Sequence, residues 1–389
     1  MSRPILAYID QAALKHNLAI TRQYAPDARI MAVIKANAYG HGLMHTAHAL
    51  KSTDGFALLE LDAAIDLRNA GYNHPILLLE GFFSTQELAL FEKYRLNAVI
   101  HHEEQVAMLD HCRHRGLNIF LKINTGMNRL GFPAEHFPAV FERLSRNPAI
   151  ANITIMSHFA TADEPGEDDD FKQQLRLFNQ VTQTGVLPPC KQNSGYHHSL
   201  ANSAAIIRYP ETHRDWVRPG LMLYGASPFI DQPAADLGLE PVMMLTSKII
   251  AIQHLRKGDK VGYGYSFQAD KPMRIGIVAC GYADGYPRHA PTGTPVLINN
   301  RRCRLIGKVS MDMLTVDITE ATDIQLNSPV ILWGKELPVE EIAYHAGTIS
   351  YELLCAVSKR VKIAVNHERT LTDPASGTQR PSCTSIIDR

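Results

Sequence analysis

The chain has 389 residues, 45% of them hydrophobic, which is enough for one large domain and a smaller one. Its 39 basic and 39 acidic residues cancel, so the composition predicts no basic surface for nucleic acid. The start of the chain has no signal-peptide block, and its apolar runs are too short to span a bilayer. Six scattered cysteines without a Cys-x-x-Cys pair predict reduced thiols in a cytoplasmic protein.

Apolar, strand-like runs alternate with helical patterns through about the first 230 residues. The predicted strands are Arg29–Ile34, Gly55–Leu59, Pro75–Glu80, Asn97–His101, Asn118–Ile123, Ile153–His158, Tyr196–Ala201 and Leu221–Tyr224. The predicted helices between them include Glu60–Ala70, Glu103–Arg115, Pro133–Asn147 and Phe171–Thr184. Eight strands that mostly alternate with helices favour an α/β fold with a closed (β/α)8 barrel of the TIM type, at residues 11–232, over an open doubly wound sheet.

The pattern changes after a proline-containing linker at residues 230–241. The β-branched runs that follow are Met244–Ala251, Arg274–Ala279, Pro295–Ile298, Cys303–Val309, Leu314–Ile318 and Val330–Trp333. Glycine, proline and asparagine separate these runs, and no long helical pattern follows until about Val339. This pattern therefore predicts a mainly β domain at residues 233–366, to which residues 1–10 can be added. The polar tail at 367–389 lacks periodicity and is predicted to be disordered.

A lysine closes the first predicted strand of the barrel. Lys35 follows the apolar run Ile30–Ile34, and small residues, a tyrosine and two glycines come after it. An ammonium group at the end of a buried strand loses hydration, which costs free energy. The side chain either reaches out to water or works as a neutral amine that forms a Schiff base with a carbonyl.

Chemistry in such barrels lies at the carboxyl ends of the strands. The candidates that follow or close predicted strands are Lys35, Arg129, His158, Ser203 and Arg218. The loops after strands seven and eight often bind phosphate, and they contain Ser203, Gly220 and Leu221. Ser203 taken alone is better explained as a helix N-cap than as a phosphate contact. A lysine together with a phosphate-binding edge suggests pyridoxal phosphate.

Nine segments of the chain resemble those of bacterial alanine racemases, in the same order and up to about Val365. They are Ala32–Gly42, Asn124–Gly131, Met156–Phe159, Ala201–Ala204, Val217–Gly220, Val261–Gly264, Gly281–Gly285, Val309–Asp312 and Ile349–Glu352. The segments Met127–Phe132 and Gly281–Gly293 look closest to the catabolic type. The resemblance implies fold type III pyridoxal-phosphate chemistry, a homodimer, and interconversion of L- and D-alanine, either to supply D-alanine for peptidoglycan or L-alanine for catabolism.

The resemblance also implies a two-base mechanism through an external aldimine of the cofactor. Lys35 would hold pyridoxal phosphate as an internal aldimine and, once displaced by alanine, act as the base on one face of Cα. The family takes its second base, a tyrosine, from the partner subunit, and the matching residue is Tyr263. A phenol with a pKa of about 10 is a poor base at pH 7, so the matched neighbours His158 and Arg218 would have to assist it. Tyr265 is a competing choice, since alternation along a strand would point both tyrosines to one side.

The other implied roles concern substrate and cofactor. Arg218 matches the residue that faces the pyridine nitrogen, and a guanidinium there makes the ring a weaker electron sink. Arg129 and the Met311 amide match contacts to the substrate carboxylate, and Tyr282 matches an entrance residue that limits side-chain size. Lys122 matches a lysine that can be carbamylated; a plain lysine paired with an acid is the alternative. The matched phosphate contacts are Tyr39, Ser203, Gly220, Leu221 and Tyr351.

Three rival functions remain at the level of sequence. A broad-specificity amino-acid racemase would use the same scaffold. A fold-related decarboxylase would place an acidic residue where Arg218 stands, and a pyridoxal-phosphate carrier protein would lack the β domain that bears Tyr263. His41 and His45 form an i, i+4 pair without a third ligand, so no metal site is expected. The expected partners are alanine and a second copy of the chain, with no nucleic acid and no membrane.

Overall fold

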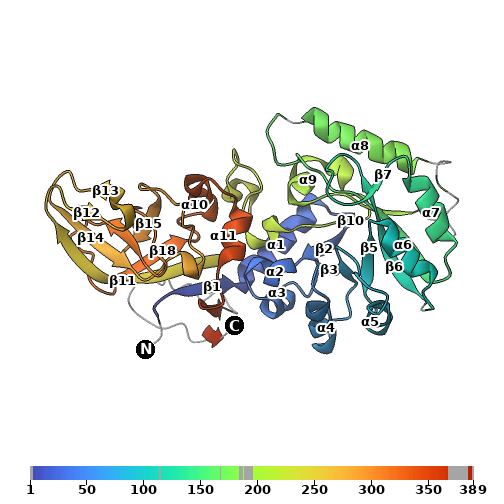
Figure 1. The fold of residues 1–389 in the computed structure, drawn as a ribbon, viewed down its shortest axis with the longest axis horizontal. Coiled ribbons are helices and arrows are strands. Elements are labelled where there is room, and N and C mark those ends of the chain that lie inside the picture. Colours follow the sequence, from blue (N-terminus) through green and yellow to red (C-terminus); the bar gives the residue numbers. More distant parts are fainter. Residues whose placement is uncertain are drawn as a thin grey trace. The chain divides into compact units, whose positions relative to one another are not determined.

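The computed structural model describes residues 3–113, 115–166, 168–183, 187, 196–366 and 384–387. The chain divides into two compact units (Figure 1). The barrel unit comprises Leu18–Ala38 and Leu50–Leu223, and the β unit comprises Met1–Asn17, Tyr39–Ala49 and Tyr224–Arg389. The β unit thus takes up Tyr39–Ala49, a segment for which no sequence pattern predicted this placement.

Eight parallel strands close on themselves in the barrel unit, which confirms the predicted barrel. In spatial order they are β2 (Arg29–Val33), β3 (Gly55–Leu58), β4 (Ile76–Leu78), β5 (Asn97–Ile100), β6 (Leu117–Asn124), β8 (Ile150–Met156), β9 (His197–Ser199) and β10 (Trp216–Val217). The short strand β7 (Phe132–Pro133) pairs with the end of β6. All residues of β3, β4 and β5 are buried, as expected for parallel strands whose faces are both covered.

The helices of the barrel unit are α4 (Leu61–Asn69), α5 (Leu88–Lys93), α6 (Glu103–Asp110), α7 (Phe137–Ser145), α8 (Asp168–Thr182) and α9 (Ser203–Arg208), with the 3-10 turns η1 (Pro210–Thr212) and η2 (Leu221–Tyr224). Helix α1 (Gln11–Tyr24) belongs partly to each unit. The buried residues of α7, which are Phe137, Val140, Phe141 and Leu144, recur at helical spacing and form one apolar stripe. Among the described helices, none is both long and apolar enough to cross a membrane.

The eighth strand of the barrel was predicted at the wrong place. Leu221–Tyr224 forms η2, and the strand that closes the barrel is β10, which pairs with β2 and β9. This strand has two residues, which is too short for any periodic pattern to reveal. The correction places Arg218 directly after a barrel strand, at its carboxyl end.

A nine-stranded, mostly antiparallel sheet forms the core of the β unit. Its order is β14 (Met273–Val278), β17 (Leu314–Asp317), β16 (Arg301–Leu305), β15 (Pro295–Ile298), β18 (Pro329–Trp333), β11 (Met243–Leu255), β1 (Leu6–Asp10), β19 (Lys362–Asn366) and β20 (Thr384–Ile387). Because β14 also pairs with β11, the first six strands in this order close on themselves. The helical elements of the unit include α3 (Leu43–Ala49), α10 (Val339–Ala346), α11 (Ser350–Ala356), η3 (Ala234–Leu237) and η5 (Tyr282–Asp284).

The polar tail departs in part from its predicted disorder. Residues Thr384–Ile387 form β20, which pairs antiparallel with β19. The rest of the tail, residues 367–383 and 388–389, lies outside the described residues.

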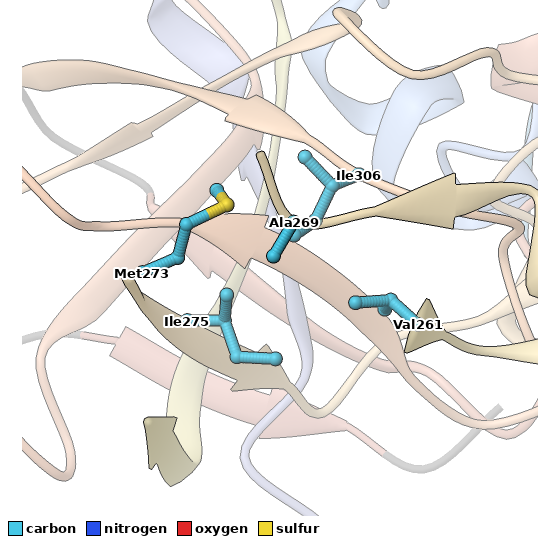
Figure 2. Packing of buried hydrophobic residues seen from close by; sticks show 5 residues of the cluster. All are labelled: Val261, Ala269, Met273, Ile275 and Ile306. Atoms are coloured by element: carbon cyan, nitrogen blue, oxygen red, sulfur yellow. The ribbon is translucent and has the colours of Figure 1, made fainter. Parts of the chain in front are cut away.

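A small hairpin extends from the β unit. Strands β12 (Lys260–Val261) and β13 (Phe267–Gln268) pair with each other, and the turn η4 (Tyr263–Tyr265) lies between them. Figure 2 shows the side chains that anchor this hairpin to β14, which are Val261, Ala269, Met273, Ile275 and Ile306. Each of these five side chains is at most 6% exposed, so the turn that carries Tyr263 has a packed apolar base.

Candidate functional site

The lysine at the end of the first barrel strand is followed by a left-handed turn. Lys35 is half-buried and begins α2 (Lys35–Tyr39). The residues Ala36–Tyr39 all have φ between 51° and 55°, a region that costs an L-amino acid about 1–2 kcal/mol. Backbone strain of this kind persists only where the surrounding structure imposes it, and it concentrates at functional sites.

Arg218, buried at the end of β10, makes a set of hydrogen bonds inside the barrel. Its Nη1 donates to Ser199 Oγ at 2.6 Å, and its Nη2 donates to the carbonyl oxygens of Ser157 at 2.7 Å and Leu200 at 3.0 Å. Nη2 also lies 3.3 Å from Nδ1 of His158. Because a guanidinium can only donate, Nδ1 must accept, and the proton of a neutral His158 therefore sits on Nε2. Burial lowers the pKa of Arg218 to about 10, so it stays charged at neutral pH.

Positive charges surround His158 and Lys122. Burial lowers the pKa of His158 well below its usual value, and the charges that add to this effect are those of Arg218, Lys122, Arg129 and Lys35. Lys122, on β6, is 7% exposed, and burial lowers its pKa to about 8, again with help from the neighbouring cations. Glu80 acts in the opposite direction on Lys122. The carboxyl end of the barrel therefore gathers cations and favours an anionic ligand.

The loops after β9 and β10 converge on one hydroxyl group. Ser203 Oγ accepts hydrogen bonds from the backbone amides of Gly220 at 2.9 Å and Met222 at 3.3 Å. The N-cap of α9 is Asn202, whose side chain accepts from the amide of Ala205 at 3.0 Å. The interpretation of Ser203 as that N-cap is thus wrong. Both amides are used by Ser203 Oγ, so the donor that this group leaves for a phosphate is the hydroxyl proton of Ser203, while Leu221 between the two amides is buried.

Two other predicted phosphate contacts lie together in the β unit. The rings of Tyr39 and Tyr351 have centroids 5.9 Å apart, and Tyr39 also stacks on Tyr224 at 4.7 Å. Burial raises the pKa of Tyr39, so its hydroxyl keeps its proton and remains a hydrogen-bond donor.

Tyr282 and Met311 come together on two adjoining segments of the β unit. The Tyr282 amide donates to the Ser310 carbonyl at 3.1 Å, and the Ala283 amide donates to the Met311 carbonyl at 3.0 Å. A side chain at Gly281 would meet the Ser310 oxygen at 2.3 Å, so only glycine permits this approach. Within the described residues, the Met311 amide donates no hydrogen bond, and the residue is 53% exposed. That amide can therefore bind a carboxylate.

Tyr263 stands on an exposed turn. The alternation argument for Tyr265 does not apply, because Tyr263 and Tyr265 belong to the turn η4 rather than to a strand, and Gly262 and Gly264 have φ of 68° and 70°. Tyr263 is 69% exposed and Tyr265 is 67% exposed. The ring of Tyr265 lies beneath Lys260 Nζ, 5.4 Å from its centroid.

One buried polar group in the barrel unit was not predicted. Gln174 is 5% exposed, and its Nε2 donates to Thr125 Oγ1 and to the His158 carbonyl, both at 3.3 Å. Gln174 therefore ties the segment that leads to Arg129 to the segment that carries His158. A polar residue on the buried stripe of α8, together with Phe171, Phe178 and Val181, is the signal that could have revealed it.

Comparison with known proteins matches both units to one family. Residues 9–228 match the family model described as alanine racemase, N-terminal domain, and residues 242–365 match the alanine racemase, C-terminal domain. An alanine racemase of Nitrosospira multiformis is 57% identical over 363 residues, which cover 93% of this chain and 99% of that protein. A catabolic alanine racemase of Salmonella typhimurium is 48% identical with the same coverage.

Solved structures give the same result. The biosynthetic alanine racemase of Pseudomonas aeruginosa has a TM-score of 0.89 and 43% identity, and the match covers 94% of this chain and 100% of that chain. The alanine racemase of Acinetobacter baumannii has a TM-score of 0.86 and 38% identity with equal coverage. The names of these relatives span both a catabolic and a biosynthetic enzyme.

Proposed function

The chain belongs to the alanine racemase family, and from this premise we propose that it interconverts L-alanine and D-alanine. The observation that carries the proposal is the arrangement at the carboxyl end of the barrel. There Arg218 fixes the tautomer of a neutral His158, and the charge of Lys35 also acts on His158.

We assign pyridoxal 5'-phosphate as the cofactor. When bound, it supplies an electron-withdrawing ring that makes the Cα hydrogen of an amino acid acidic. Lys35 would hold its carbonyl end, and the guanidinium of Arg218 would donate to its ring nitrogen. The residues that would bind its phosphate are Tyr39, Ser203, Gly220, Leu221 and Tyr351. The Ser203 hydroxyl supports this assignment, because it accepts from the Gly220 and Met222 amides and keeps its own proton to donate.

Two groups of the chain would exchange the Cα proton. Lys35 Nζ would act on one face of Cα and Tyr263 Oη on the other, since inversion needs a base and an acid on opposite faces. His158 supports the second role through its tautomer. Because its Nδ1 accepts from Arg218, its Nε2 carries a proton that can stabilise a phenolate oxygen.

The second base would come from another copy of the chain. Tyr263 lies on an exposed turn, and further large side chains of the β unit are also exposed, namely Tyr265, Tyr282, Met311, Met313 and Ile349. Tyr282 and Met311 lie on adjoining segments, and grouped exposed apolar side chains often mark a surface that another protein covers. We therefore propose a homodimer in which each barrel receives Tyr263 from its partner.

Recognition of alanine would rest on its carboxylate and its small side chain. Arg129 and the Met311 amide would bind the carboxylate, and Tyr282 would limit the size of the side chain. Lys122 would be carbamylated, because its lowered pKa makes the reactive neutral amine more abundant than in a free lysine and the surrounding cations, Arg129 among them, would stabilise the carbamate anion. Within the described residues, Lys122 makes no ion pair with Glu80, which favours carbamylation over a plain lysine paired with an acid.

The test is racemisation by the purified protein with added pyridoxal phosphate. Separate incubations with L-alanine and D-alanine, followed by chiral chromatography, should converge on equal amounts of both enantiomers, because the two have equal free energy. A panel with serine, 2-aminobutyrate, lysine and arginine should give a kcat/KM at least about 10-fold below that of alanine. No racemisation of any amino acid would overturn the proposal, and comparable rates on lysine or arginine would replace it by a broad-specificity racemase.

A further inference from the structure

We propose that Arg3 and Arg360 are positioning residues for substrate binding, because together they hold the two segments that carry Tyr282 and the Met311 amide. The inference rests on the proposed function, since it assigns the two arginines a role in recognising alanine. Neither arginine belongs to a segment that resembled the racemase family, and Arg3 is 281 residues from its main partner, Asp284.

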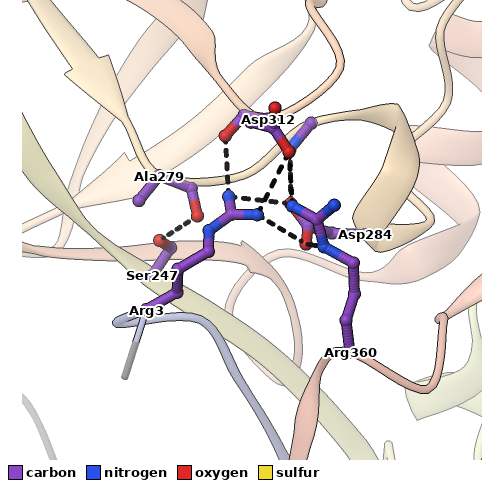
Figure 3. A network of polar contacts seen from close by, with 7 residues as sticks. Arg3, Ser247, Ala279, Asp284, Asp312 and Arg360 are labelled. Atoms are coloured by element: carbon purple, nitrogen blue, oxygen red, sulfur yellow. Dashed lines mark hydrogen bonds and ion pairs between the residues drawn. The ribbon is translucent and has the colours of Figure 1, made fainter. Parts of the chain in front are cut away.

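Asp284 is the buried centre of the network in Figure 3. Its side chain has no exposed surface, yet two guanidinium groups reach it. Arg3 forms a two-pronged pair, with Nη1 to Oδ1 and Nη2 to Oδ2 both at 3.1 Å, and Arg360 Nε lies 2.8 Å from Oδ1. The Gly281 amide donates to Oδ2 at 2.9 Å, which closes the short turn that contains Tyr282.

The same two arginines also bind Asp312, the residue after Met311. Arg3 Nη2 donates to the Asp312 carbonyl at 2.7 Å, and Nη1 lies 3.4 Å from its Oδ1. Arg360 Nη2 forms an ion pair with the same carboxylate oxygen. Each guanidinium therefore bridges the Tyr282 turn and the Met311 segment, as the dashed lines of Figure 3 show.

The two bridging arginines fix the orientation of the Tyr282 turn and the Met311 segment as well as the distance between them. A guanidinium is planar and holds its donors in a rigid fork, so two bridging arginines set the mutual orientation of the segments. Backbone hydrogen bonds from the Tyr282 amide to Ser310 and from the Ala283 amide to Met311 then hold the exposed Met311 amide in that orientation. Loss of one arginine would leave the fold intact but let the amide and the Tyr282 ring shift, and shifts of about 1 Å are costly for substrate positioning.

The experiment compares Arg3→Gln with a matched control, Arg302→Gln, in the full-length protein with its cofactor. Arg302 forms a two-pronged pair with Glu341 in the same unit, outside the Tyr282 and Met311 segments. Arg3→Gln should raise KM for alanine about five-fold and reduce the preference for alanine over 2-aminobutyrate, with kcat within about two-fold of wild type. Arg302→Gln should leave both constants unchanged, and Arg3→Lys should fall between wild type and Arg3→Gln because it keeps the charge without the fork.

A measurement independent of activity separates the inference from the proposed function. Hydrogen exchange of a peptide that spans residues 308–313 should be faster in Arg3→Gln than in wild type and unchanged in Arg302→Gln. Equal exchange and equal KM in Arg3→Gln and wild type would overturn the positioning role, whether or not the protein racemises alanine. A wild-type protein that does not racemise alanine but shows the exchange difference would overturn the proposed function and leave only a structural clamp.

Discussion

The barrel unit and the β unit present their candidate residues in opposite ways. In the barrel, Arg218 makes hydrogen bonds to four groups and Ser203 accepts from two amides, so that buried contacts fix the site. In the β unit, Tyr263, Tyr282 and Met311 are exposed side chains on turns. Glycines allow the conformation of these turns, and ion pairs of arginine hold the turn of Tyr282 in place. Residues that are already held by buried hydrogen bonds need only a ligand to complete a site. Residues on exposed turns also need a second protein surface that encloses the ligand.

The largest effect should come from the barrel side of this comparison. Lys35→Ala removes both the proposed anchor of the cofactor and one of the two bases, so racemisation should fall by at least about 10⁴-fold. The visible absorbance of the bound cofactor should vanish in the same variant. Full absorbance in Lys35→Ala, measured by spectroscopy after gel filtration, would contradict the anchoring role.

The corresponding change on the exposed side is Tyr263→Phe, with Tyr265→Phe as the matched control. Tyr263→Phe keeps the ring and removes the hydroxyl, so kcat should fall about 10²–10⁴-fold while the cofactor absorbance is retained. The two directions of racemisation should show unequal exchange of the Cα hydrogen with solvent deuterium, since one base remains. Equal losses in Tyr263→Phe and Tyr265→Phe would refute the assignment between the two tyrosines.

The claim that the exposed half serves a different chain can be tested by mixing. Dimers of Lys35→Ala and dimers of Tyr263→Phe are each nearly inactive, but a hybrid has one site with both wild-type bases. Random exchange of subunits should therefore restore about one quarter of wild-type activity. Verified exchange, for example by native mass spectrometry, without any recovery would show that the two bases act within one chain.

Lys122 gives a pH dependence that belongs to the barrel alone. Only a neutral amine adds carbon dioxide, and the pKa of Lys122 is lowered to about 8 from the 10.5 of a free lysine. The neutral fraction, and with it carbamylation, should thus rise from about 1% at pH 6 to a majority above pH 8. Carbon-13 spectra with labelled bicarbonate should show a carbamate signal that grows over this range and is absent in Lys122→Arg.

The smallest effect is expected at the base of the hairpin that carries Tyr263. Ile275→Val removes one methylene from its apolar cluster and should lower the free energy of unfolding by about 0.5–1.5 kcal/mol. Because the cluster supports η4 without touching substrate, kcat at 25 °C should stay near wild type. Chemical denaturation would measure the stability and steady-state kinetics would measure kcat. A loss of kcat as large as that of Tyr263→Phe would show that the position of Tyr263 depends on the exact packing of this cluster.

Sequence patterns revealed the parts of this molecule that depend on local periodicity. The apolar runs predicted seven of the barrel strands, and Lys35 stood out because a charged residue ended such a run. The eighth strand was missed because Trp216–Val217 takes its conformation from its neighbours β2 and β9 rather than from its own pattern. The turn at Tyr263 was not predicted either, because it depends on the positive φ of Gly262 and Gly264, which the residue pattern does not reveal.

The clamp around Asp284 shows a second limit of sequence patterns. Arg3 and Arg360 come from distant parts of the chain, and each alone looks like an ordinary surface arginine. Gln174 differs, because a polar residue in the apolar stripe of α8 can be recognised in the sequence alone. A buried polar side chain on a helix is therefore predictable, whereas an ion network between distant loops requires the fold.

The left-handed turn after Lys35 determines how late in synthesis this part of the chain can reach its final conformation. Strain in Ala36–Tyr39 must be balanced by later contacts, and Gly40 at its end packs so tightly on Leu354 that a side chain there would lie 2.3 Å from the Leu354 oxygen. A ribosome releases residue 354 more than three hundred residues after Gly40. The first barrel strand can therefore form early in synthesis, but the turn that aims its lysine acquires this support only when the chain is almost complete.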